Sequence, residues 1–162
     1  MQKINLVFVL LIFLINGCAT PSTLGSKINF DNSQTYAASL DKVWEAIIEV
    51  VSENNLIIST LEKDSGIISL TNVPYEPSWA DEGVRGESVG MEHVITERIA
   101  NFNIFARADD KGLVTVRVNS SMKMLERSGN NSAAYPFSYA WLPSYSNGTL
   151  ERLILSNIST KL

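Results

Sequence analysis

The sequence predicts an α+β domain of two layers, in which an antiparallel sheet of about four strands carries an N-terminal and a C-terminal helix on one face. Three observations lead to this prediction. Apolar residues recur at helical spacing near both ends of residues 38–162, and two β-hairpins with alternating side chains lie between them. The 162 residues are also enough for one domain and too few for two ordinary ones.

Two segments have the apolar spacing of an amphipathic helix. The first begins after Ser39, a suitable N-cap, and places Asp41 in its first turn, where the helix dipole favours an acid. The second begins near Asn147 or Gly148. The apolar stripe of the first consists of Leu40, Val43, Trp44, Ile47, Val50 and Val51, and that of the second of Leu150, Leu153, Ile154 and Ile158.

Two hairpins make up the predicted sheet. The first joins residues 56–61 to 67–73, with Gly66 available for the positive φ of the turn. The second joins residues 92–107 to 113–125, where apolar and polar side chains alternate. This alternation predicts a sheet with one face on the core and the other in water.

The N-terminus has the features of an export signal. Leu6–Ile15 is an unbroken apolar run of ten residues, too short to span a bilayer as a helix and of the right length for the centre of a signal peptide. The residues that follow, Ile15-Asn16-Gly17-Cys18, resemble the bacterial lipobox. This resemblance implies that residues 1–17 are removed and that Cys18 becomes an acylated first residue.

The predicted mature chain has an anchor, a tether and a domain. Two or more acyl chains, as lipobox proteins generally carry, hold a protein stably on a membrane. Residues 18–37 are rich in small polar residues and predict a flexible tether with a span of roughly 23 Å. The residue after Cys18 is Ala19 and not Asp. In this the chain resembles lipoproteins that are sent to the periplasmic face of the outer membrane, and not those that are kept at the inner membrane. Residues 38–162 then form the single domain.

Two stretches resemble a known family. These stretches are similar to the helix-grip domains of BamC-like (NlpB-type) envelope lipoproteins. The first is residues 39–73, which begins "SLDKVWEAIIEVVSENNLIISTLEKDSGIISLTN" and ends at Val73, and the second is residues 146–158, "SNGTLERLILSNI". Asp64 and Gly66 match as turn-formers. The resemblance implies a helix-grip α+β fold and a role related to outer-membrane protein assembly.

Composition argues against several function classes. The formal net charge is −4 and no basic block is present, so nucleic acid is not an expected partner. A single cysteine allows no intrachain disulfide, and a single histidine allows no two-histidine metal site within one chain. We expect His93 to be an ordinary strand or loop residue. We therefore expect no enzyme activity, no metal and no cofactor beyond the lipid on Cys18.

The aromatic residues are the main candidates for binding. Tyr135, Phe137, Tyr139 and Trp141 share one face if their segment is extended. The default expectation is that they are buried as a cover of the core; if exposed, they are suited to gripping a partner or stacking on sugar rings. Trp79, in the acidic loop 74–90, is either a binding anchor or a local packing residue.

Together these features predict a lipid-anchored periplasmic lipoprotein that is a non-catalytic binding or assembly module of the cell envelope. Its expected partners are the membrane, through the lipid, and another envelope protein. The alternative is a carrier of lipid or of a small apolar ligand, because a helix packed across a curved sheet can enclose a cavity.

Overall fold

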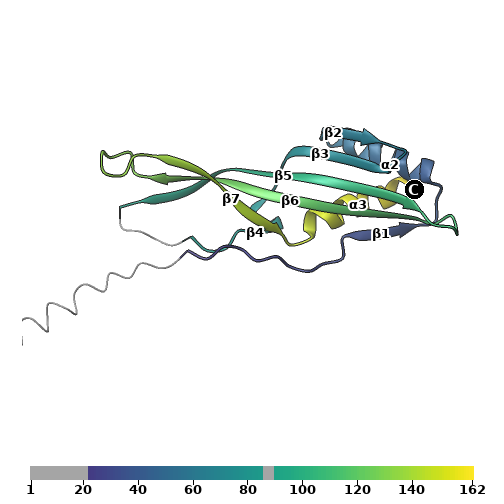
Figure 1. Ribbon diagram of the computed structural model, residues 1–162, viewed down its shortest axis with the longest axis horizontal. Helices are drawn as coiled ribbons and strands as arrows, with labels where there is room; N and C mark the ends of the chain where they lie inside the picture. Colours follow the sequence, from purple (N-terminus) through teal and green to yellow (C-terminus); the bar gives the residue numbers. More distant parts are fainter. Residues whose placement is uncertain (1–21, 86–89) are drawn as a thin grey trace, which may run out of the picture.

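The computed structural model describes residues 22–85 and 90–162 and shows a seven-stranded antiparallel sheet with two helices (Figure 1). The sheet order is β2-β3-β5-β6-β7-β4, and β1 pairs with β6 beside this path. The predicted signal peptide, Cys18 and the first residues of the predicted tether lie outside the described residues. The elements are β1 (Ser33–Tyr36), α2 (Leu40–Glu53), β2 (Ile57–Glu62), β3 (Ile67–Pro74), the short 3₁₀ helix η2 (Pro77–Trp79), β4 (Ala80–Asp81), β5 (Glu92–Ala108), β6 (Val114–Gly129), β7 (Ser138–Ser146) and α3 (Thr149–Lys161).

The predicted fold class is wrong. The described residues are mostly sheet, with 47% in strands and 22% in helices. They form one antiparallel sheet of seven strands, whereas the sequence predicted a two-layer domain with a sheet of about four. The three additional strands are β1, β4 and β7. β1 and β4 have four and two residues, too few to show a regular alternation. The first four residues of β7 are all exposed, so this strand lacks the alternation of a strand covered on one face.

The two predicted helices and both predicted hairpins are confirmed as elements. Ser39 caps α2, where its side chain accepts a hydrogen bond from the backbone N–H of Lys42. Gly66 adopts φ +68° between β2 and β3, and a side chain there would collide with the carbonyl oxygen of Ala106. Glycine is thus required for the turn and for the close approach of β5.

The core lies between the helices and one face of the sheet. β5 supplies Phe102, Ile104 and Ala106, and β6 supplies Val114, Val116, Val118 and Met122. α2 contacts β5, whereas α3 contacts β1, β6 and α2. The helix residues that fill this layer are Val43, Trp44, Ala46, Ile47, Val50 and Val51 from α2, and Leu150, Ile154, Leu155 and Ile158 from α3.

The β5–β6 hairpin is much longer than either helix. β5 has 17 residues, which extend about 55 Å, while α2 has 14 residues and a length of about 21 Å. Figure 1 shows the consequence: β5, β6 and β7 continue beyond the helices as a three-stranded projection. We call this projection, residues 92–98 and 123–142, the arm.

The described end of the predicted tether is part of the fold. β1 pairs with β6 from Ser33 opposite Arg117 to Tyr36 opposite Val114. Upstream, Thr23 bridges to Val84, and Ser26 donates two hydrogen bonds to the Asp81 carboxylate. Residues 23–36 are therefore held against the domain at several points, so a flexible tether that extends to residue 37 is not what the structure describes.

Tyr36 tests this docking. Its ring is in the core, and its hydroxyl donates a 2.8 Å hydrogen bond to the backbone oxygen of Leu155 in α3. Tyr36→Phe removes this hydrogen bond, while the Ser159 hydroxyl still donates to the same oxygen. We expect the free energy of unfolding to fall by about 1 kcal/mol. Chemical denaturation measures this. Tyr139→Phe is the matched control, because Tyr139 is an exposed tyrosine, and we expect its change to stay within about 0.5 kcal/mol. Equal stability of Tyr36→Phe and the parent would contradict the docking.

Candidate binding surface

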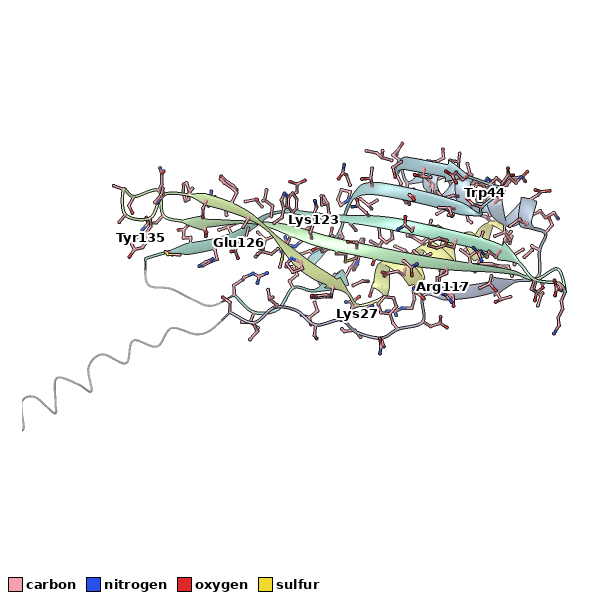
Figure 2. All side chains as sticks on the ribbon, viewed as in Figure 1. Lys27, Trp44, Arg117, Lys123, Glu126 and Tyr135 are labelled. Atoms are coloured by element: carbon pink, nitrogen blue, oxygen red, sulfur yellow. The ribbon has the colours of Figure 1, made fainter. Side chains whose placement is uncertain are left out.

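The candidate aromatic residues are exposed, so the expectation that they cover the core is wrong. The exposed fractions are 48% for Tyr135, 38% for Phe137, 61% for Tyr139 and 43% for Trp141. Tyr135 lies in the loop at the tip of the arm, as Figure 2 shows, and Tyr139 and Trp141 lie in β7. The helices end before the arm, which leaves these rings without a cover from α2 or α3.

The rings of β7 share the outer face of the arm with basic side chains of β6. Tyr139 pairs with Arg127 and Trp141 pairs with Leu125, so these side chains point to the same side of the sheet. The Lys123 ammonium lies 4.5 Å from the centre of the Trp141 ring, and the Arg127 guanidinium lies 4.6 Å from that of Phe137. These are cation–π distances, and such contacts favour one orientation of each ring.

The inner face of the arm is covered by another chain segment, not by the helices. Residues 80–85 run across it, and the Glu126 carboxylate meets Arg85 at 3.2 Å and His93 at 3.4 Å. In the same segment, Glu82 accepts hydrogen bonds of 2.6 and 2.9 Å from Arg98. This fork-to-fork contact raises the pKa of the Arg98 guanidinium. His93 is thus a β5 residue that faces a carboxylate, and the arm's inner face is held by ion pairs.

Trp79 does not belong to this aromatic surface. It ends η2, is half-buried, and packs against the hydrophobic core. Its backbone oxygen accepts a hydrogen bond from the N–H of Asn147, which joins η2 to the start of α3. Of the two roles that the sequence leaves open for Trp79, the geometry matches local packing.

A hollow of about 520 Å³ lies between residues 27–32 and the β6–β7 edge, beside Glu151. Glu151 is 1% exposed and accepts hydrogen bonds from the hydroxyls of Ser120 and Ser146. It sits in the first turn of α3, where the helix dipole favours an acidic residue. Glu151 therefore ties the start of α3 to β6 and β7.

A second hollow, of about 420 Å³, lies on the outer face of the sheet over the helix-covered region. We call it the outer groove. Its lining consists of Phe105, Arg107, Thr115, Arg117 and Asn119. Sequence reasoning did not select these residues, although the alternation in β5 and β6 placed Arg107, Thr115, Arg117 and Asn119 on the polar face.

Two further findings apply to the described residues only. None of their helices is both long enough and apolar enough to cross a membrane. Within residues 22–85 and 90–162, no three His, Cys, Asp or Glu side chains are grouped so that they could hold a metal ion.

Comparison with protein-family models and with curated proteins finds no match for this chain. The resemblance to BamC-like lipoproteins therefore remains a prediction from residues 39–73 and 146–158.

Proposed function

We propose that this protein is a lipid-anchored, non-catalytic binding module of the bacterial cell envelope, and that the outer face of the arm binds another envelope protein. The observation that carries the proposal is the exposure of Phe137, Tyr139 and Trp141 beside the basic side chains of Lys123 and Arg127. The lipobox-like sequence at Cys18 supplies the predicted anchor, at the periplasmic face of the outer membrane.

The composition of the arm is that of a protein-binding surface. Tyrosine, tryptophan and arginine are enriched among the residues that contribute most to protein–protein affinity. Their rings have few rotatable bonds, so ordering them on binding costs little entropy. The cation–π contacts of Trp141 and Phe137 restrict the rings further in the free protein. The surface is therefore partly preorganised for binding.

The carrier function gains no support from the hollows. A carrier needs apolar space between helix and sheet, whereas the side chains there are buried and close-packed, with Val43, Ile68 and Ile158 each at zero exposure. The hollow beside Glu151 and the outer groove are both lined by polar groups as well as apolar ones. No specific observation favours this alternative.

The first test changes the arm surface. In the double variant Tyr139→Ala/Trp141→Ala we expect the partner to bind at least tenfold more weakly, because large aromatic anchors are lost. A photoreactive residue at Phe137 measures this in intact cells through the yield of a discrete protein adduct. The free energy of unfolding should change by less than about 1 kcal/mol, since the outer face is exposed.

Leu153→Ala is the matched control, because Leu153 is 45% exposed on α3, away from the arm. We expect its adduct yield to equal that of the parent. An adduct that persists at full yield in the double variant would contradict the assignment of the arm as the binding surface.

The second test addresses the anchor. Cys18→Ala removes the predicted acylated sulfur, so we expect it to abolish labelling by an alkyne-bearing palmitate and to move the protein out of the membrane fraction. Ala19→Asp keeps the cysteine and serves as the comparison: labelling should persist while the protein shifts from the outer to the inner membrane. A Cys18→Ala variant that still labels and sediments with membranes would refute the anchor.

A further inference from the structure

The outer groove combines an apolar floor with two strong cations. Phe105 is half-buried in β5 and pairs with Arg117 of β6, while Arg107 pairs with Thr115. Arg107 and Arg117 are thus diagonal neighbours on the same face of one strand pair, within reach of each other's side chains. Asn119 continues the row along β6 and lines the groove with them.

Neither of these arginines has an internal acidic partner among the described residues. Five other basic side chains do: Lys63 pairs with Asp41, Arg85 with Glu126, Arg98 with Glu82, Arg127 with Glu92, and Lys161 with Glu49 and Glu53. Lys27, Lys42, Lys111, Lys123 and Arg152 also lack an ion pair within the described residues, so what sets Arg107 and Arg117 apart is that they are neighbours on one face of the β5–β6 pair. The chain has 17 acidic residues against 13 lysines and arginines, so acids are plentiful. Two cations that lie side by side without an acidic partner repel each other across the strands. An external anion would relieve this repulsion.

The surroundings of the groove present hydroxyl and amide groups. Asn103 accepts a hydrogen bond from Ser69, Asn101 accepts one from Thr71, and Asn119 accepts one from Asn32. These pairs form a polar row across the outer face of β3, β5 and β6 beside Phe105. A surface of amides and hydroxyls around one aromatic ring offers hydrogen bonds to many hydroxyls together with a stacking face.

We propose that the outer groove binds an acidic saccharide, a sugar that carries a phosphate, sulfate or carboxylate group. Arg107 and Arg117 bind the anionic group through their forked N–H donors. The ring of Phe105 contacts the apolar face of the sugar, and Thr115 and Asn119 hydrogen-bond its hydroxyls. At about 420 Å³ the groove is within the size range of small-ligand sites. The proposal does not depend on the protein partner of the arm, because the residues differ.

The test uses the full chain purified in a neutral detergent and two immobilised polymers, dextran sulfate and uncharged dextran. We expect binding to dextran sulfate and none to dextran. Arg107→Gln/Arg117→Gln should weaken the binding to dextran sulfate at least tenfold and reduce the slope of log affinity against log salt by about 2, since each cation releases about one counterion.

Two variants distinguish specific binding in the outer groove from attraction of the polymer by net charge. Lys42→Gln/Arg152→Gln removes the same two charges from the helices and should leave the affinity within about twofold, because those residues lie on α2 and α3. Phe105→Thr removes the ring but no charge, and it should weaken binding to dextran sulfate several-fold while leaving inorganic polyphosphate unaffected. Thermal unfolding confirms that each variant is folded.

Three outcomes would overturn the proposal. The first is no binding of the parent chain to dextran sulfate. The second is an equal loss of affinity in the groove variant and in the helix control, which would mean that net charge alone attracts the polymer. The third is an unchanged affinity of Phe105→Thr for dextran sulfate, which would mean that the groove holds a bare anion and not a sugar.

Discussion

The pairing of β5 with β6 is the constraint on which the rest of the structure depends. The register runs without interruption by another element from Glu92 opposite Gly129 to Ala108 opposite Val114, with one irregularity near Ile95. Two helices of 14 and 13 residues cannot cover a ribbon of this length, since a helix rises less than half as far per residue as a strand. The fold therefore has a helix-covered region and an arm, and both the buried core and the exposed aromatic surface follow from this difference in length.

The outer edge of β6 is shared by two strands from opposite ends of the chain. β1 occupies residues 114–117 and β7 occupies residues 122–128. This sharing explains why a chain segment with the composition of a linker is ordered: it completes hydrogen bonds on β6 that β7 leaves open. It also brings Asn32, upstream of β1, onto Asn119, so that the N-terminal segment contributes to the outer face.

Local signals in the sequence predicted the helices and hairpins, and non-local pairing decided the remainder. The N-cap at Ser39 and the turn at Gly66 depend on residues within a few positions, so both can be predicted from the sequence. Ser33–Tyr36 has only one core side chain, and β7 contains Pro143, which is tolerated because that strand is paired on one side there. Alternation indicated that Tyr139 and Trp141 share a face, but not that the helices would end before reaching them. Arg107 and Arg117 could be placed on the polar face, whereas their isolation from acids depends on the register and on where each acid falls.

A binding surface on the arm requires that the arm is an ordered sheet before any partner binds. Hydrogen–deuterium exchange of the full chain, followed by mass spectrometry, measures this directly for peptides from residues 92–98 and 122–129. We expect exchange far slower than in unstructured peptides of the same sequence, because the backbone amides are paired between β5, β6 and β7. Exchange at the unstructured rate in these peptides, with protection limited to the region under α2 and α3, would contradict it.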